Sequence, residues 1–245
     1  MRPDAAHDSP QGGTRLREWR DANPATQAAT LAAAIAADLA AALTRRATAS
    51  LVVSGGRTPL AMFAHLARHA LDWSRVQITL ADERWVPVDD AASNERLVRT
   101  ALLRDAAASA RFIGMKNEAA TPAAGGARTW AAIGAMSQPF DVVVLGMGDD
   151  GHTASLFPGS AELAAALDLT AKPGCIEVHP PAAANARLSL NLAALLQSRQ
   201  LFIQISGAHK WQVYQQAREA GPIENLPVRA ILRQTVVPLD VYWCP

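Results

Sequence analysis

A short stretch in the middle of the 245-residue chain has the composition of a catalytic loop. The apolar run 142–145 leads into a segment with glycine at 146, 148 and 151, and Asp150 and His152 belong to the same segment. Glycine adopts positive φ readily and lets a ligand approach the backbone closely. A carboxylate beside an imidazole is suited to activating water by general-base catalysis. The same pattern also fits a glycine-rich turn whose histidine only forms a hydrogen bond with a neighbouring residue. Other parts of the chain must therefore distinguish between these two interpretations.

A second stretch has the composition of an anion-binding turn. It follows the apolar run 50–53 and reads Ser54-Gly55-Gly56-Arg57-Thr58-Pro59. We expect Thr58 to cap a helix that runs from Pro59 to about residue 70. Free backbone N–H groups and the positive end of the helix dipole would then face one point, as in phosphate-binding turns. An ordinary tight turn also favours two glycines. The stretch is not a P-loop, because the Gly-x-x-x-x-Gly-Lys spacing is missing.

Charged residues also follow two other predicted strands. The charges at 82–84 come directly after the apolar run 76–81, and Lys210 follows the run 201–206. Charges at the end of a buried strand are costly unless they have partners or a ligand, although a solvated loop would also accommodate them. Arg187 and Lys210 are suited to binding phosphate, the arginine as a fork and the lysine as a point charge. Each of them taken alone also fits a solvated surface cation.

The elements that must position these side chains alternate along the chain. Strands are predicted at 14–20, 50–53, 76–81, 112–113, 140–145, 175–179, 201–206 and 236–243. Helices are predicted over 24–46, 59–70, from 93 or 94 onward, after the connection 114–126 to about 136, within 159–170, from 185–191 through 196, from 208 to about 219, and over 227–232. This alternation predicts an α/β fold with an open, parallel-rich sheet and helices on both faces. We expect one domain over 14–245 and a disordered tail over 1–13.

The sheet predicted in this way brings the polar stretches together. Right-handed crossovers place the carboxyl ends of parallel strands on one edge, where open α/β sheets bind ligands. Four strand ends carry polar groups there, at 54–58, 82–84, 150–152 and 207–210. One polar turn is uninformative, but four at the same edge predict a site that joins an anion cradle, cations and an acid–base pair.

Composition limits the function classes. Half of the residues are hydrophobic, 18% are charged and the formal net charge is +1, so we expect no nucleic-acid or membrane partner. Cys175 and Cys244 form neither a disulfide framework nor a zinc site, and the N-terminus does not resemble a secretory signal. The alanine-rich stretch 31–43 is too short to span a bilayer. The histidines lack metal-ligand spacing. These features predict a cytoplasmic protein, a monomer or a small homo-oligomer.

The quoted motifs resemble those of a known family. They are 54–59, Asp82-Glu83-Arg84-Trp85-Val86-Pro87, Ser93-Asn94, Gly146-Met147-Gly148-Asp149-Asp150-Gly151-His152-Thr153-Ala154-Ser155-Leu156-Phe157-Pro158-Gly159, Arg187-Leu188-Ser189 and Gly207-x-x-Lys210. The chain resembles the 6-phosphogluconolactonases over roughly residues 15 to 243, and more distantly the glucosamine-6-phosphate deaminases. The resemblance implies a modified Rossmann-like fold. It also implies hydrolysis of 6-phospho-D-glucono-1,5-lactone in the pentose phosphate pathway.

The resemblance also implies a role for each candidate residue. The substrate phosphate would be bound by Ser54, Gly55, Gly56, Arg57, Thr58, Arg187 and Lys210. Asp82 and Arg84 would line the sugar end, and His152, oriented by Asp150, would take a proton from the attacking water. Either Arg84 or backbone N–H groups of the His152 loop would stabilise the oxyanion. No cofactor or metal is required.

Two alternatives are weighed against this interpretation. The deaminases carry a glutamate five residues after the motif histidine, where this chain has Phe157, and an aromatic ring cannot transfer protons. A sugar-phosphate sensor of the same fold would carry a DNA-binding segment, and no basic helix-turn-helix precedes Thr14. The roles of Arg57, Glu83 and His209 are left open by the sequence.

Overall fold

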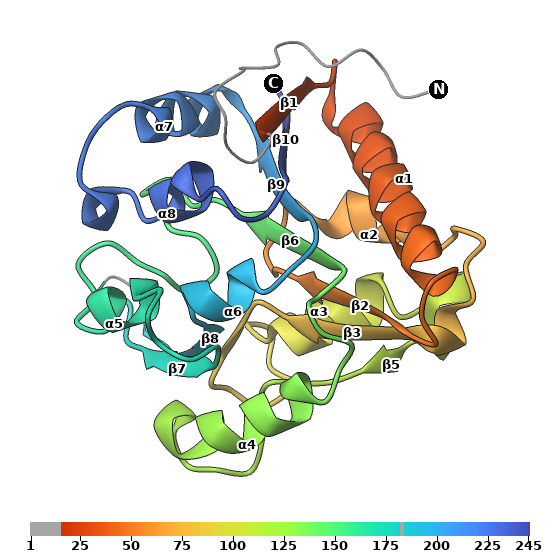
Figure 1. Ribbon diagram of the computed structural model, residues 1–245, viewed down its shortest axis with the longest axis horizontal. Coiled ribbons are helices and arrows are strands. Elements are labelled where there is room, and N and C mark those ends of the chain that lie inside the picture. Colours follow the sequence, from red (N-terminus) through yellow and green to blue (C-terminus); the bar gives the residue numbers. More distant parts are fainter. Residues whose placement is uncertain (1–15, 182–183) are drawn as a thin grey trace.

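The computed structural model describes residues 16–181 and 184–245. Over this part of the chain the main sheet has seven parallel strands in the order β1-β10-β9-β6-β2-β3-β5 (Figure 1). Its strands are β1 (Leu16–Arg20), β2 (Ala49–Val53), β3 (Val76–Leu80), β5 (Arg111–Phe112), β6 (Val142–Gly146), β9 (Leu201–Ser206) and β10 (Leu239–Cys244). The predicted tail 1–13 and the predicted strand start at Thr14 lie outside the described residues.

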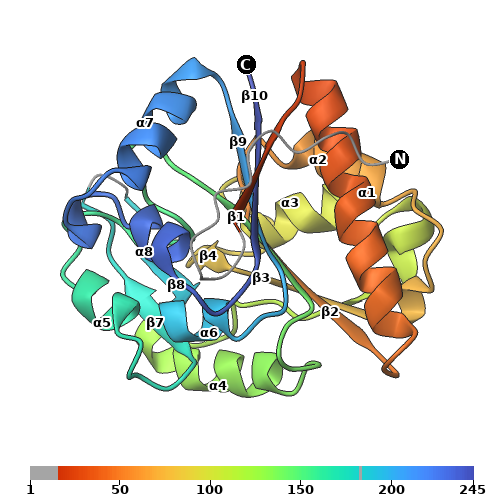
Figure 2. The same ribbon diagram turned by 45° about the horizontal axis from the view of Figure 1, so that its top comes forward.

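Helices cover both faces of this sheet, as the alternating pattern predicted. They are α1 (Pro24–Leu43), α2 (Leu60–Leu66), α3 (Asn94–Ala101), α4 (Pro122–Gly134), α5 (Leu163–Leu167), α6 (Leu192–Leu196), α7 (Ala208–Arg218) and α8 (Val228–Arg233). Figure 2 shows α1 and α2 on one side of the sheet and α7 and α8 on the other. Buried apolar side chains of the strands and of these helices form one continuous core.

The strand order reverses between β2 and β6, which are hydrogen-bonded neighbours. From β2 the chain builds outward to β3 and β5, and it then returns to place β6, β9 and β10 on the other side. The backbone N–H of Ser54, just after β2, donates to the carbonyl oxygen of Val144 in β6 at 3.0 Å. The carboxyl ends of both strands therefore open into the same crevice, where doubly wound sheets bind their ligands.

A second sheet corrects two predictions. The charged segment 82–84, expected to be the polar end of the strand 76–81, is a separate strand, β4 (Asp82–Arg84), and the segment expected only to lead into a helix contains β8 (Arg187–Leu190). These two strands and β7 (Cys175–Val178) form an antiparallel sheet in the order β4-β8-β7. A three-residue strand of charged side chains has no apolar alternation, so its sequence cannot reveal it. The pairing with β8 determines it.

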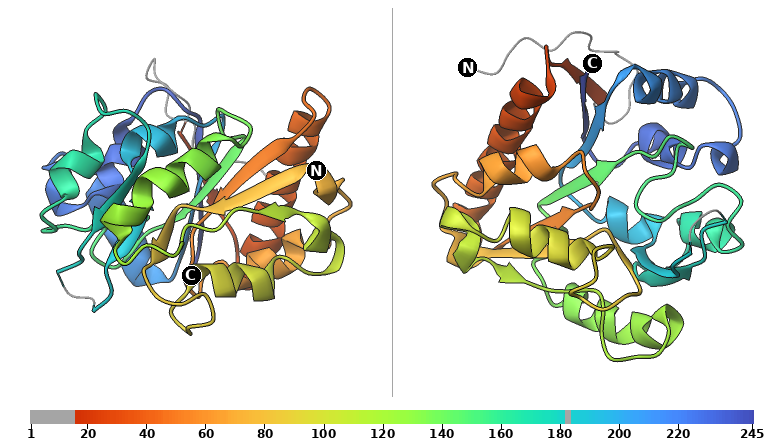
Figure 3. Two further views of the ribbon diagram at one scale, coloured as in Figure 1. Left: turned by 90° about the horizontal axis from the view of Figure 1, so that it is seen from below. Right: turned by 180° about the vertical axis from the view of Figure 1, so that it is seen from behind.

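Helix α4 corrects a third prediction, because it begins at Pro122, within the segment expected to be a connection. The side chain of Thr121 accepts a hydrogen bond from the N–H of Ala124 and caps the helix at 3.2 Å. Gly125 lies inside the helix, where a Cβ would come within 2.6 Å of the Trp85 ring. Its glycines thus permit close packing rather than a turn. Figure 3 shows α4 from below and from behind, beside the small sheet, whose strands β7 and β8 it contacts.

Helix α1 is the longest helix of the described chain, and its apolar stripe packs in the core of the protein. Asn23 caps it by accepting from the N–H of Thr26 at 2.9 Å. Leu31, Ile35 and Leu39 of the predicted stripe are fully buried. With 20 residues and a mean hydropathy of 1.4, α1 is long and apolar enough to cross a membrane, which the stretch 31–43 alone did not suggest. Half of that window is buried against the rest of the protein.

Candidate active site

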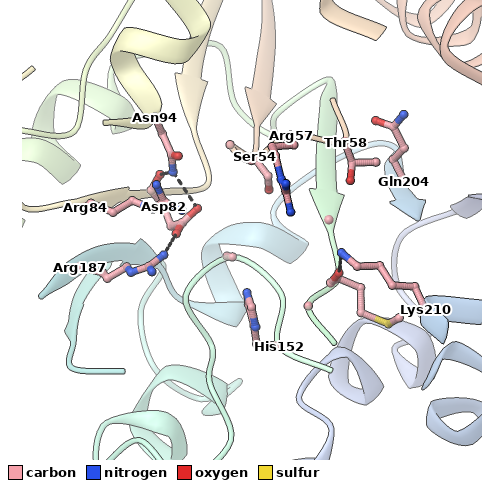
Figure 4. A pocket seen from close by; sticks show the side chains of 16 residues that line it. Ser54, Arg57, Thr58, Asp82, Arg84, Asn94, His152, Arg187, Gln204 and Lys210 are labelled. Carbon is pink, nitrogen blue, oxygen red and sulfur yellow. Dashed lines mark hydrogen bonds and ion pairs between the residues drawn. The ribbon is translucent and has the colours of Figure 1, made fainter. Parts of the chain in front are cut away.

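The predicted residues meet in one cavity of about 230 Å³ at the carboxyl ends of β2, β6 and β9 (Figure 4). Its wall is formed by Ser54, Gly55, Gly56, Arg57, Thr58, Asp82, Arg84, Asn94, Gly146, Met147, Gly148, His152, Ala154, Arg187, Gln204 and Lys210. Asp150 is not part of this wall, but it contacts His152, which is. The convergence of separate strand ends, inferred from polar residues that follow apolar runs, is therefore present in the structure.

His152 is fixed by the loop that follows β6. Its Nδ1 lies 2.5 Å from Oδ1 of Asp150, and the same oxygen accepts from the His152 backbone N–H at 3.1 Å. The N–H of Gly148 donates to the carbonyl oxygen of His152 at 2.9 Å and closes the loop. A Cβ on Gly148 would come within 2.1 Å of the imidazole Nδ1, so glycine leaves the space that the ring occupies. The loop thus holds the imidazole in the wall of the cavity.

The Asp150–His152 pair also determines which ring nitrogen can act as a base. Partial burial tends to raise the pKa of Asp150, but the hydrogen bond and charge of His152 outweigh it and lower that pKa below its ordinary value. Asp150 is therefore an ionised carboxylate at neutral pH, and a carboxylate only accepts hydrogen bonds. The proton of the neutral imidazole must then be on Nδ1, which leaves Nε2 free to accept a proton.

The small sheet forms a charged wall of the cavity. Arg84 in β4 and Arg187 in β8 are cross-strand partners, and Asp82 is opposite Ser189. Asp82 Oδ2 accepts a hydrogen bond from Ser155 Oγ at 2.5 Å and lies 3.6 Å from Nη1 of Arg187. Arg84 donates from Nη1 to the carbonyl oxygen of Ala92 at 2.5 Å. Two guanidinium groups therefore share this wall with a single buried carboxylate.

Glu83, between Asp82 and Arg84, points the other way and is a structural residue. Its carboxylate accepts from the backbone N–H groups of Arg84, Asn94 and Glu95 at 2.7, 2.8 and 2.7 Å, and from Ser93 Oγ at 3.1 Å. Burial raises the pKa of Glu83, while these backbone hydrogen bonds act in the opposite direction. Glu83 thus ties β4 to the N-terminus of α3. The question left open by the sequence is answered, since Glu83 contacts neighbours.

The predicted anion cradle lies on the opposite side of the cavity. Figure 4 shows Thr58 and Lys210 to one side of His152, and Asp82, Arg84 and Arg187 to the other. Lys210 Nζ donates to the carbonyl oxygen of Met147 at 2.7 Å, which directs its charge toward the cavity. Ser54 Oγ is buried and has no hydrogen-bond partner among the described residues. This side offers a cation and an unused hydroxyl to an anion.

The structure changes the predicted cap of the helix that follows this turn. Helix α2 begins at Leu60, one residue later than expected, and the N-cap position is Pro59, so Thr58 makes no capping bond within the described chain. Its hydroxyl faces the cavity because Pro59, with helical φ and ψ, already continues into the helix. Arg187, which is expected to bind the phosphate together with Lys210, lies beside Asp82 because β8 pairs with β4.

The structure adds Gln204 to the site. Gln204 stands in β9 within an otherwise apolar run and is 5% exposed. Its Nε2 donates to Gln27 Oε1 at 3.0 Å, and its Oε1 has no partner among the described residues. A polar residue inside a buried strand was the available signal in the sequence. His209, by contrast, is exposed on α7. Residues 16–181 and 184–245 contain no group of three or more metal-ligating side chains placed to hold an ion.

The fold and the cavity together define a doubly wound α/β protein with a cationic ligand site at its switch point. A model of the family described as glucosamine-6-phosphate isomerases/6-phosphogluconolactonase matches residues 22–243. The chain belongs to this family. A 6-phosphogluconolactonase of Rhizobium meliloti is 45% identical, over 91% of this chain and 96% of the relative, and one of Pseudomonas putida is 42% identical, over 94% and 93%.

A solved structure agrees with these relatives. The crystal structure of a 6-phosphogluconolactonase from Shewanella baltica OS155 superimposes with a TM-score of 0.90 at 46% identity. The match covers 93% of this chain and 97% of that one. The α/β fold predicted from the sequence, with its parallel-rich sheet, is confirmed.

Proposed function

We propose that this protein hydrolyses 6-phospho-D-glucono-1,5-lactone to 6-phospho-D-gluconate, the second step of the oxidative pentose phosphate pathway. The observation that carries the proposal is the His152–Asp150 pair, 2.5 Å apart, at a cavity that is also lined by Lys210 and three arginines. The base suits activation of water, and the cations suit a phosphorylated substrate. The relatives from Rhizobium meliloti and Pseudomonas putida carry the name of this activity, and their similarity to this protein extends over 91% and 94% of its chain.

The reaction follows from the geometry of His152. Nε2 takes a proton from a water molecule whose oxygen forms a bond to the lactone carbonyl carbon, and Asp150 stabilises the resulting imidazolium. The tetrahedral intermediate then collapses as the bond from this carbon to the ring oxygen breaks. The ring oxygen takes the proton from His152 and becomes the 5-hydroxyl group, and the new carboxylic acid ionises. One water is consumed and the base is regenerated, so no redox or metal cofactor is required.

Position 157 supports hydrolysis over deamination. The Phe157 ring lies 4.1 Å from the imidazole of His152, between centroids, at an interplanar angle of 31°. A hydrocarbon ring at this point cannot move a proton to or from an amine or a ring oxygen. The proposed chemistry places no such demand on it, because His152 performs both proton transfers.

We place the substrate phosphate at Ser54, Thr58 and Lys210. An unpaired hydroxyl, a cavity-facing threonine and an ammonium group give it donors and a compensating charge. The backbone of 55–57 completes the cradle.

The proposal also places the protein in the cytoplasm, as a monomer or small homo-oligomer. Cys175 and Cys244 are free thiols, which fits a reducing compartment.

Hydrolysis of freshly generated lactone tests the proposal. The lactone is formed in the assay by a glucose-6-phosphate dehydrogenase, and its loss is followed by acid release against the spontaneous rate. We expect the protein to accelerate hydrolysis and to release no ammonia from glucosamine 6-phosphate. A lactone decay that equals the background, or vigorous ammonia release, would overturn the assignment.

A further inference from the structure

Phe157 links the proposed base to one of the arginines. The ring is 8% exposed. His152 packs on it at 4.1 Å between ring centroids, and the guanidinium carbon of Arg187 lies 5.2 Å from the same centroid. A cation over an aromatic face and a close pair of aromatic rings are both attractive contacts. His152 and Arg187 are therefore positioned relative to each other by a single side chain, and both line the cavity.

Arg187 also has hydrogen-bonding capacity to spare. Its side chain is 12% exposed, and Nη1 lies 3.6 Å from Asp82 Oδ2, whose closer partner is Ser155 Oγ at 2.5 Å. Nε of Arg187 and Nε of its cross-strand partner Arg84 are both buried without hydrogen-bond partners in the described chain. Burial of a guanidinium with incomplete pairing is costly. A negatively charged ligand atom at this wall would supply the missing partner.

The shape of the substrate determines which of its atoms can be the negatively charged partner of Arg187. In the lactone the carbonyl carbon attacked by water, carbon 1, and carbon 5 are bonded to the same ring oxygen, and the phosphate is carried on carbon 6, which is attached to carbon 5. The carbonyl and the phosphate arm therefore flank the ring oxygen on its two sides. His152 must lie beside the carbonyl carbon. A residue packed on the same phenyl ring as His152 belongs to the carbonyl side, and Lys210 on the other side of the cavity belongs to the phosphate side (Figure 4).

From this geometry we propose that Arg187 is a catalytic residue that stabilises the oxyanion of the tetrahedral intermediate, and that it does not bind the phosphate. The inference rests on the proposed lactone hydrolysis. As the bond from water to the carbonyl carbon forms, the carbonyl π electrons move onto its oxygen, and Arg187 donates hydrogen bonds to the resulting charge. The charge returns to the carbonyl when the ring-oxygen bond breaks. Phe157 positions Arg187 and His152 on this carbonyl.

Substitution of Arg187 separates the two roles. Arg187→Met keeps much of the side-chain length and removes the charge, and Lys210→Met is the matched control. Loss of one oxyanion donor costs about 10²–10³-fold in kcat. We expect that loss for Arg187→Met with KM little changed, whereas Lys210→Met raises KM. With unphosphorylated glucono-1,5-lactone, Arg187→Met should lower the enzymatic rate by the same factor, and Lys210→Met should have little effect.

Binding of glucitol 6-phosphate provides a second, independent measurement, because this compound has the phosphate but neither a lactone carbonyl nor a carboxylate. Calorimetry should give Arg187→Met the wild-type Kd and Lys210→Met a raised Kd. Arg187→Lys, which keeps a positive charge, should bind equally well and recover part of kcat. It replaces Arg187→Met if near-ultraviolet circular dichroism shows that the latter is misfolded.

The outcomes that overturn this assignment differ from those that overturn the proposed function. A raised Kd for glucitol 6-phosphate in an Arg187 variant would return Arg187 to the phosphate. An unchanged kcat would remove it from the chemistry. In either case the wild-type protein would still hydrolyse the phosphorylated lactone. If the wild-type protein fails to do so, the proposed function fails first.

Discussion

At the scale of single residues, His152 is oriented by two neighbours with different roles. Asp150 accepts from Nδ1 at 2.5 Å and fixes the tautomer, and Phe157 packs against the ring face at 4.1 Å. The sequence indicated the Asp–His pair because both residues stand in a glycine-rich loop after a buried strand. The packing role of Phe157 was not predictable, since an aromatic residue in a loop contains no information about which ring it touches.

Asp150→Asn should weaken catalysis without preventing folding. An asparagine keeps the size of the side chain but loses the charge that stabilises the imidazolium. We expect kcat to fall by roughly 10²-fold, at the lower end of the 10²–10⁴ that general-base catalysis supplies. Steady-state hydrolysis of the lactone checks this, with Asp149→Asn as a neighbouring control. Full activity in Asp150→Asn would show that the carboxylate does not assist His152.

The same variant should change how stability depends on pH. Because the pKa of Asp150 is lower in the folded protein than its ordinary value of 3.8, its contribution to stability is complete above that value. The contribution is lost as the pH falls through the lower folded pKa. Thermal unfolding of the wild type and of Asp150→Asn, followed from about pH 6 to pH 3, should give a Tm difference that shrinks toward acid. Parallel Tm curves would contradict this linkage.

At the scale of elements, the short antiparallel sheet sets the chemistry of one cavity wall. It places Arg84 opposite Arg187 and brings Asp82 to the same side. Glu83, in the same strand, binds the N-terminus of α3 through the backbone N–H groups of Asn94 and Glu95. Hydrophobic periodicity predicted the long strands and α1 correctly. It could not predict β4, because three consecutive charged residues show no period.

Glu83→Gln should therefore destabilise the protein and not only the site. Both carboxylate oxygens of Glu83 accept hydrogen bonds, and an amide nitrogen cannot accept. One lost buried partner costs about 1–3 kcal/mol, which corresponds to a fall in Tm of about 2 to 12 °C. Scanning calorimetry measures this shift. Glu118→Gln, on an exposed loop, should leave Tm unchanged. An equal Tm for the two variants would mean that Glu83 does not stabilise the junction of β4 and α3.

At the scale of the whole molecule, the strand order explains why distant segments form one site. The reversal between β2 and β6 opens a crevice, and the end of β9 joins it from the neighbouring position. Alternating strands and helices were sufficient to predict this convergence, because parallel strands end at one edge. The alternating strands and helices were insufficient to predict that Arg187 and Lys210 lie on different sides of the cavity. That separation depends on the pairing of β8 with β4, a contact between segments about a hundred residues apart.

The central claim is that His152, in this cavity, removes the proton from the water that opens the lactone. Its most direct test compares His152→Ala with the wild type on freshly generated 6-phosphoglucono-1,5-lactone, with thermal unfolding in the presence of 6-phosphogluconate as the measure of binding. We expect the variant to lose about 10²–10⁴-fold in rate and to keep the rise in Tm that the product causes. Full turnover by a folded His152→Ala protein would contradict the claim.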